Sequence, residues 1–436
     1  MRKKLLNILF WSVLSAAFIG PGTITTAAKA GASHGFDLAW ALVFSVFACL
    51  VLQEAAARLS IVSKKSLGKA ISNRYQDKRF GWLVFVLVIG AIVIGSAAYE
   101  TGNLLGAASG IGIFSALKPS AWVVIISVTA AIALFFPRLQ LLAKILGILV
   151  VLMGISFLIT AFMVKPDPGD FFTGIMIPNL PAGSGLLVLG LVGTTVVPYN
   201  LFLGSGIADK DQALYEMRFG LAIAIILGGI FSLAVLVVGT SVQGEFTFAS
   251  LGQAIAAKIG NWAVWFFGFG LFAAGFSSAI TAPLASAITA KDLFQKNKNP
   301  KWNSRGRYFI FTWGFVLVSG LVFGTIGLKP IPAIIAAQAL NGLILPFISI
   351  FLWFAINNKN LMGAEGVNSF IANILFGIVV WVTLILGGQN IITSILKTLG
   401  NDTEAGKLYI IMIASASFLF TLFLFFRVQF SKDQNN

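Results

Sequence analysis

The 436-residue chain has little charge, one cysteine and one histidine. Only 10% of its residues are charged, against about 25% in an ordinary soluble domain, and 58% are hydrophobic. The lone Cys49 excludes an internal disulfide and a cysteine cluster for a metal. An intramembrane enzyme would need a nucleophile with its base or a pair of acids, and the sequence offers no such set. We therefore expect a protein that is not an enzyme and uses no cofactor.

The charge that is present is mostly basic, with a formal net value of +15. Such an excess could suggest nucleic acid, but the Lys and Arg residues gather at both termini and in alternate loops, such as 64–79 and 291–307. The opposite loops hold few. This positive-inside pattern is typical of membrane proteins. It predicts a multi-pass protein of the plasma membrane with both termini cytoplasmic, whose surroundings are lipid and not nucleic acid.

Long apolar runs make up most of the chain, and each is long enough to cross a bilayer. Residues 1–20 imitate a signal peptide, but because many further spans follow, we interpret them as the uncleaved start of the first helix. We expect about twelve transmembrane helices. Their approximate bounds are 9–30, 38–59, 81–108, 120–136, 141–164, 184–208, 217–242, 252–290, 306–327, 331–356, 367–396 and 407–427.

Two of these segments, the first and the sixth, are interrupted near the middle. The first contains Gly20-Pro21-Gly22-Thr23, and the sixth contains Val197-Pro198-Tyr199-Asn200. Proline removes a backbone donor and glycine weakens a helix, so a break at this depth must be surrounded by protein or a polar cavity. The two segments enter from opposite sides, which indicates an inverted-repeat transporter with its site at the midplane. The alternative is that either proline merely kinks its helix.

The predicted fold class is an all-α polytopic membrane protein with a 5+5 inverted repeat, in which helices 1 and 6 are interrupted. We expect a single transmembrane transporter domain over residues 1–436. Repeat one would cover about 9–164 and repeat two about 184–356, with appended helices at about 367–427. A channel would use ligand rings or selectivity loops, so the broken helices favour a carrier that works by alternating access.

Several motifs along the whole chain resemble those of the natural resistance-associated macrophage protein (NRAMP) family of proton-coupled divalent metal transporters. Beyond the two broken helices, the matching stretches are Ala28-Lys29-Ala30-Gly31-Ala32, Leu52-Gln53-Glu54-Ala55-Ala56-Ala57-Arg58-Leu59, Leu180-Pro181-Ala182-Gly183, Ala274-Gly275-Phe276-Ser277-Ser278 and Leu345-Pro346-Phe347. The resemblance implies the LeuT-like fold, which agrees with the inverted repeat. It also implies a divalent metal as substrate.

The metal-site motifs of that family are altered in this chain. Typical members carry Asp-Pro-Gly-Asn in the first helix and Met-Pro-His-Asn in the sixth, where the Asp, Asn and Met side chains and a backbone carbonyl hold the metal. The corresponding residues here are Gly20, Thr23, Val197 and Tyr199. No thioether favours a transition metal, and no carboxylate offsets dehydration of a divalent cation. We therefore assign no metal ligand.

The altered site favours a small anionic or zwitterionic carboxylate as substrate. The half-helix that follows Gly22 points free amides and the positive end of its dipole into the break, where an anion can bind. A divalent metal importer (Mn/Fe or hydrated Mg) remains the alternative. The predicted substrate-binding residues are Gly20, Gly22, Thr23, Thr26, Thr194, Val197, Tyr199, Asn200, Gln338 and Asn341.

Four further residues are candidates for coupling to an ion gradient. Glu100 is an acid deep in the third segment, so it could carry a proton, although a structural role is equally open. The acid-to-arginine route of the family is incomplete here, because a nearby Asp and the arginine of the ninth helix are missing. Lys29 either attracts an anion or extends to the interface. Ser277 and Ser278 could hold Na⁺, or could simply allow close helix packing. We prefer H⁺ to Na⁺.

Overall fold

The computed structural model describes residues 19–76, 79, 81–136, 140–207, 210–295, 299–398 and 407–433, and every regular element in these ranges is helical. The α-helices are α2 (Pro21–His34), α3 (Ala39–Ser63), α4 (Leu67–Tyr75), α5 (Gly81–Ile89), α6 (Gly95–Gly112), α7 (Pro119–Phe135), α8 (Gln140–Val164), α9 (Pro168–Met176), α10 (Gly185–Thr195), α11 (Pro198–Ile207), α12 (Leu214–Gly239), α13 (Phe248–Ile259), α14 (Trp262–Phe294), α15 (Arg307–Thr325), α16 (Pro330–Ile356), α17 (Lys359–Gly366), α18 (Phe370–Thr398) and α19 (Lys407–Asp433). A π-turn at Gly90–Ile94 joins α5 to α6, and a 3₁₀ turn lies at Pro300–Trp302.

The predicted spans correspond to helices of the structure. Ten segments are long and apolar enough to cross a membrane, and α7 is a shorter apolar helix. Residues 9–18 of the expected first span lie outside the described residues, and α2 is its described part. The expected span 252–290 is in fact two helices, because Gly260, at φ 98°, ends α13 before α14 begins. The repeat boundaries stay a prediction.

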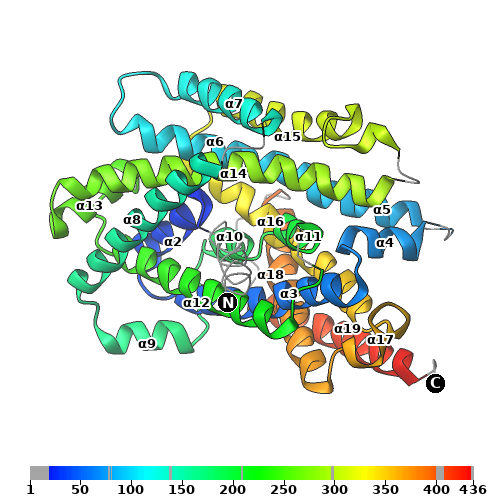
Figure 1. Ribbon diagram of the computed structural model, residues 1–436. Helices are drawn as coiled ribbons and strands as arrows, with labels where there is room; N and C mark the ends of the chain where they lie inside the picture. Colours follow the sequence, from blue (N-terminus) through cyan, green and yellow to red (C-terminus); the bar gives the residue numbers. More distant parts are fainter. Residues whose placement is uncertain are drawn as a thin grey trace.

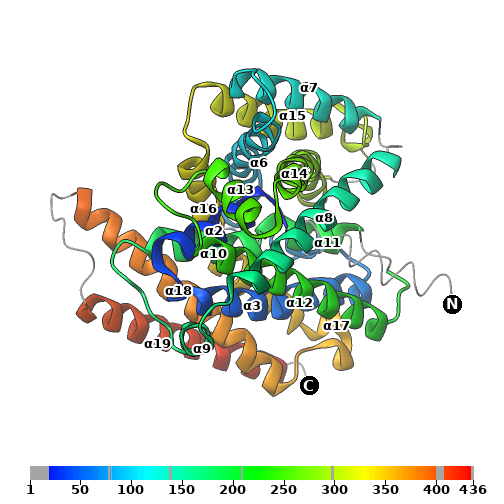
Figure 2. The same ribbon diagram turned by 90° about the vertical axis from the view of Figure 1, so that its left-hand side faces the viewer.

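The helices form layers around a central group (Figure 1). Helices α7 and α15 lie on one side, above α6 and α14, while α3 and α12 lie on the opposite side. The view from the side shows the same order, with α2, α10 and α16 between these layers (Figure 2). Helix α2 packs on α12, and α10 packs on α16. The described parts of the two interrupted helices therefore lie inside the bundle.

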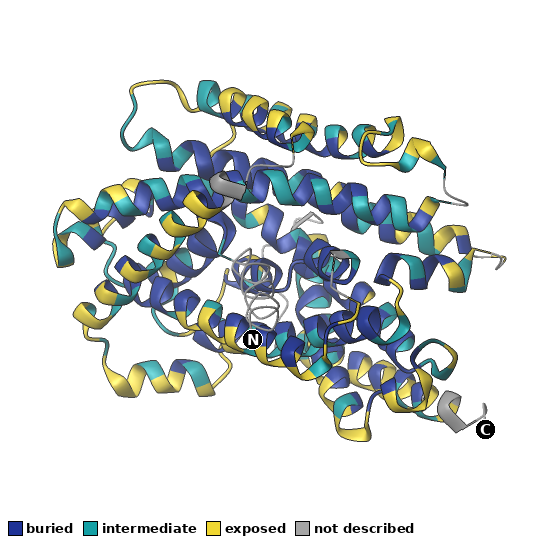
Figure 3. Ribbon diagram, viewed as in Figure 1, coloured by how far each residue is buried: buried dark blue, intermediate teal, exposed yellow. Residues whose placement is uncertain are grey.

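Burial differs sharply between the central and outer helices (Figure 3). In the span formed by α10 and α11, 94% of the residues in the most apolar 18-residue stretch are buried. The corresponding share is 11% in α19 and 28% in α8. The outer helices are apolar because lipid covers them. The span formed by α10 and α11 is apolar because protein covers it. A helix break at membrane depth requires such surrounding protein.

Candidate substrate site at the two helix breaks

The first break lies at the start of α2. Gly20 precedes the helix in an extended conformation, with φ −104° and ψ 177°, and Pro21 occupies the first turn. Proline suits this position because the first amides of a helix have no partner within it. The Ile24 amide donates to the Gly20 carbonyl at 3.3 Å. The amides of Gly22 and Thr23 therefore lie at the open end of the helix.

The second break separates α10 from α11. The Val196 amide still donates to the Val192 carbonyl at 2.9 Å, but Val196 itself leaves the helix, with φ −105° and ψ 75°. Pro198 then begins α11. Because proline has no amide hydrogen, the carbonyls of the last turn of α10 lose their helical partners. The break thus presents backbone oxygens.

The two breaks meet through a pair of hydroxyl groups. Thr23 Oγ1 of α2 lies 3.1 Å from Thr194 Oγ1 of α10, and both side chains are buried. A Cβ atom at Gly22 would lie 2.2 Å from Gln338 Nε2 and 2.8 Å from Thr194 Oγ1, so only glycine leaves room there for the Gln338 amide of α16. We call Gly22, Thr23, Thr194 and Gln338 the central junction.

Two tyrosines line the next part of the first break. A Cβ atom at Gly20, where the family has its aspartate, would lie 3.4 Å from the Tyr99 hydroxyl and 3.5 Å from Ser278 Oγ. The ring of Tyr99 meets that of Tyr199 edge to face, with centroids 5.4 Å apart. Tyr99 was not among the predicted site residues. Its place beside Glu100 in the middle of a span was the signal that could have found it.

All ten predicted substrate-binding residues are buried, but they do not all reach the central junction. Thr26 turns its hydroxyl back to the Gly22 carbonyl at 2.8 Å. Asn341 lies next to α10, where a Cβ atom at Gly193 would be 3.1 Å from its own Cβ. The side-chain amide of Asn200 makes no hydrogen bond within the described part of the chain. Val197 is a fully buried apolar residue at the second break.

Glu100 packs against α15. A Cβ atom at Gly320 of α15 would lie 2.5 Å from Glu100 Cγ, so the carboxyl packs against α15. Asn103 Nδ2 donates to Glu100 Oε2 at 3.2 Å, while Oε1 has no partner among the described residues. From Tyr308 to Thr325 this helix contains no arginine. The carboxyl group is thus buried without a basic partner on the helix that it faces.

The other three predicted coupling residues occupy different surroundings. Lys29 Nζ lies 5.6 Å from the ring centroid of Phe246, about 12 Å along α2 from the break, at a rise of about 1.5 Å per residue. This location fits the interface alternative better than a role in the break. Ser278 is buried beside Gly20, whereas the Ser277 hydroxyl donates within its own helix, to Ala274 O at 3.1 Å. The coupling roles stay predictions.

The chemistry of the central junction is that of neutral oxygen and amide groups. In the described residues no three His, Cys, Asp or Glu side chains come together as a metal site would require. Thr23 is 2% exposed, Thr194 0% and Gln338 1%, so solvent does not reach the junction in this conformation. A substrate would enter only after the surrounding helices move, as in alternating access.

A family model described as natural resistance-associated macrophage protein-like matches residues 12–393. The chain belongs to the NRAMP family. Among NRAMP relatives, a divalent metal cation transporter MntH of Klebsiella pneumoniae is 25% identical over 88% of this chain and 93% of its own length. A natural resistance-associated macrophage protein 2 homolog of Dictyostelium discoideum is 26% identical, over 84% of this chain and 61% of its own length. The chain is thus a membrane transporter and not an enzyme.

Solved structures give the same fold. The manganese transporter of Eremococcus coleocola superposes with a TM-score of 0.72 at 19% identity, over 100% of this chain and 96% of that one. An inward-facing nucleobase-cation-symport-1 transporter, Mhp1, superposes with a TM-score of 0.54 at 15% identity, over 97% and 90%. The predicted LeuT-like inverted repeat, with helices 1 and 6 interrupted, is therefore confirmed for this NRAMP chain.

Proposed function

We propose that this NRAMP protein carries a hard divalent cation, such as Mg²⁺ or Mn²⁺, through the central junction by alternating access. The observation that carries the proposal is the Gln338 side-chain oxygen. This oxygen is buried and has no partner in the described chain. It belongs to the amide group that reaches the meeting point of the two breaks, where the amide nitrogen lies closest to Gly22, beside the Thr194 hydroxyl. A cation would supply the missing interaction.

The donor set decides which cations fit. Hydroxyl, amide and backbone oxygens suit Mg²⁺ and Mn²⁺, whereas softer metals gain from a sulfur ligand that is absent here, because Val197 stands in the methionine position. No carboxylate lies at the junction, so the ion would keep part of its water shell, as Mg²⁺ commonly does. We infer a selectivity shifted from Cd²⁺ and Fe²⁺ toward Mg²⁺ and Mn²⁺.

Two findings make a cation the better substrate than the carboxylate expected from the sequence. The Klebsiella pneumoniae relative is named as a divalent metal cation transporter and the Eremococcus coleocola protein as a manganese transporter, and none of the proteins described above is named for a carboxylate. The one basic side chain expected to attract an anion, Lys29, lies over Phe246 and not in the break. The carboxylate hypothesis therefore becomes the rival outcome of the test.

We propose Glu100 as the proton carrier, with Na⁺ at Ser278 as the second choice. Its carboxyl lies one helix face away from Tyr99, which lines the first break, so protonation can affect the substrate site through α6. We also propose that the protein lies in the plasma membrane with both termini cytoplasmic, because the basic loops follow the positive-inside rule.

Uptake into proteoliposomes tests the substrate. The full chain should accumulate Mg²⁺ and Mn²⁺ saturably and Cd²⁺ poorly, and Gln338→Leu should weaken cation affinity about tenfold, the effect of one lost charge-dipole contact. Accumulation of an amino acid or organic acid, with no divalent cation transported, would instead establish the carboxylate hypothesis.

The same vesicles test coupling. In Glu100→Gln an inwardly directed proton gradient should no longer drive accumulation, while downhill cation flux continues. A Na⁺ gradient that drives uptake equally well in the wild type and in Glu100→Gln would remove Glu100 from the mechanism and point to Ser278.

A further inference from the structure

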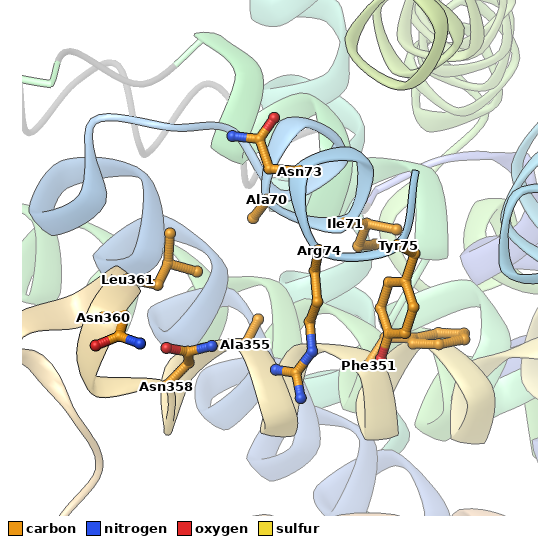
Figure 4. A pocket seen from close by; sticks show the side chains of 10 residues that line it. All are labelled: Ala70, Ile71, Asn73, Arg74, Tyr75, Phe351, Ala355, Asn358, Asn360 and Leu361. Carbon is orange, nitrogen blue, oxygen red and sulfur yellow. The ribbon is translucent and has the colours of Figure 1, made fainter. Parts of the chain in front are cut away.

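A cavity of about 200 Å³ lies far from the central junction, between α4, the end of α16 and the start of α17 (Figure 4). This volume is several times the ~30 Å³ that a water molecule occupies in the liquid. The lining residues are Ala70, Ile71, Asn73, Arg74, Tyr75, Phe351, Ala355, Asn358, Asn360 and Leu361. None of them belongs to the proposed transport site, so this is a separate site.

Arg74 is the principal polar group of this cavity. Its side chain extends from the last turn of α4 toward α16, between Asn358 on one side and Tyr75 on the other (Figure 4). The guanidinium carbon lies 5.7 Å from the ring centroid of Tyr75 and 5.8 Å from that of Phe354, and Nη1 donates to the Phe354 carbonyl at 3.4 Å. These contacts hold the guanidinium group in place while most of its five N–H donors stay available.

The charge around Arg74 is not compensated locally. Among the described residues, Arg74 forms no ion pair, and no Asp or Glu lines the cavity. An adjoining cavity of about 60 Å³ shares Arg74, Asn358 and Asn360, and adds Lys359. Two cations and several side-chain amides thus surround one space. A guanidinium with neighbouring amide donors is the typical receptor of a phosphate group.

Apolar side chains also line the cavity: Ile71 and Phe351 lie on the Tyr75 side, and Leu361 lies on the Asn360 side (Figure 4). Helix α4 follows directly on α3, at the face of the membrane where the basic loops gather. A phospholipid offers both parts that such a cavity needs, an anionic phosphate and an apolar glycerol–acyl junction. Basic pockets between transmembrane helices at the cytoplasmic face bind anionic headgroups in this way.

We propose that the cavity between α4 and the α16–α17 turn binds the phosphate group of an anionic phospholipid from the membrane face where the basic loops gather, through Arg74. A soluble phosphate compound has the same anionic chemistry, but it would leave the apolar lining residues uncovered. Bound lipid would join α4 to α16 and α17, which otherwise make few direct contacts.

The test is lipid binding by the full chain purified in a neutral detergent. Fluorescent phosphatidylglycerol should bind saturably and phosphatidylcholine weakly. Arg74→Ala should weaken phosphatidylglycerol binding tenfold or more, and Arg74→Lys should restore part of it, since the charge returns without the planar fork. Arg305→Ala is the matched control, because Arg305 is an exposed basic residue that lines neither cavity, and its variant should bind like the wild type.

A second variant guards against loss of folding. Asn360 is exposed at the rim, so Asn360→Asp should fold normally and still weaken phosphatidylglycerol binding, because it places a carboxylate beside Arg74. Inorganic phosphate and glycerol phosphate are added as competitors. Full displacement by either at low concentration would show a soluble phosphate site and overturn the lipid proposal. Equal binding of the two lipids, or unchanged binding in both Arg74→Ala and Asn360→Asp, would overturn the site itself.

Discussion

The central junction and the ionic cluster at the end of α3 use polar residues in opposite ways. At the junction Thr23, Thr194 and Gln338 are neutral and buried. In the ionic cluster, which we define as Glu54, Arg58 and Arg218, charges are paired: Arg58 Nε donates to Glu54 Oε1 at 3.0 Å, and Arg218 Nε donates to the same oxygen at 2.9 Å. At the junction the Gln338 side-chain oxygen has no hydrogen-bond partner among the described residues, whereas in the ionic cluster the Glu54 carboxylate is paired with two arginines.

The difference shows where this chain places its charge. The ionic cluster joins α3 to α12, and Arg58 Nη1 donates to the Gly366 carbonyl at 2.5 Å, which adds the end of α17. Its charges therefore hold helices together. The junction contains no charge, and its close approaches depend on glycine. A substrate there would be held by dipoles, so geometry matters more at the junction than net charge does.

The largest expected effect comes from adding one methyl group at the junction. In Gly193→Ala the new Cβ would lie 2.0 Å from the Gln338 backbone oxygen and 2.5 Å from the Gly342 amide nitrogen, so α10 and α16 must separate. Overpacking of this kind costs about 1–3 kcal/mol or more. We expect cation uptake to fall to background. Gly228→Ala in α12 is the matched control, since nothing lies within 4 Å of its added Cβ. Normal uptake by Gly193→Ala would contradict the claim that transport requires close packing of α10 on α16.

Arg58→Ala should come next, and its effect should be on stability. Arg58 is 6% exposed and donates to Glu54, Gly366 and Asn368, so its removal leaves a carboxylate and two buried acceptors short of a partner. We expect a loss of about 3 kcal/mol, seen as a lower midpoint of thermal unfolding by tryptophan fluorescence. An unchanged midpoint would mean that the cluster does not hold α17.

Thr23→Val tests the hydroxyl pair with little change of shape. It removes the hydrogen bond to Thr194, worth about 1 kcal/mol of stability, together with an oxygen ligand. We expect cation affinity to fall about tenfold while the unfolding midpoint falls slightly. Thr129→Val is the control, because this exposed hydroxyl of α7 bonds only within its own helix. Equal affinities in both variants would exclude Thr23 from the site.

Arg218→Ala should have the smallest effect. Its side chain is 55% exposed, and Glu54 keeps Arg58 as a partner. Exposed ion pairs contribute about 0–1 kcal/mol, so the unfolding midpoint should move little, and less at high salt. A shift as large as that of Arg58→Ala would show that the cluster acts as one network.

The fold was largely predictable because its signals are local and repeated. Apolar runs of membrane length give the spans, and a proline among glycines in two spans of opposite direction gives the inverted repeat. The split at Gly260 was not found, because the flanking residues are apolar on both sides and the positive φ of one glycine leaves no periodic signal.

The site was predictable only in part. The residues at the breaks were found, since proline marks them. Tyr99 was missed, and the orientation of Glu100 toward Gly320 could not be foreseen, because both depend on how α6 rotates against α2 and α15. The cavity at Arg74 could not be predicted either, because α4 and the α16–α17 turn, which form it, are nearly 300 residues apart in the sequence.

The most direct measurement is the anomalous scattering of Mn²⁺ in crystals of the full chain soaked with the ion. The account predicts one strong peak within ligand distance of the Thr23 and Thr194 hydroxyls and the Gln338 side-chain oxygen, with water completing the shell. A peak only elsewhere, or organic density at the junction with no Mn²⁺ there, would contradict it.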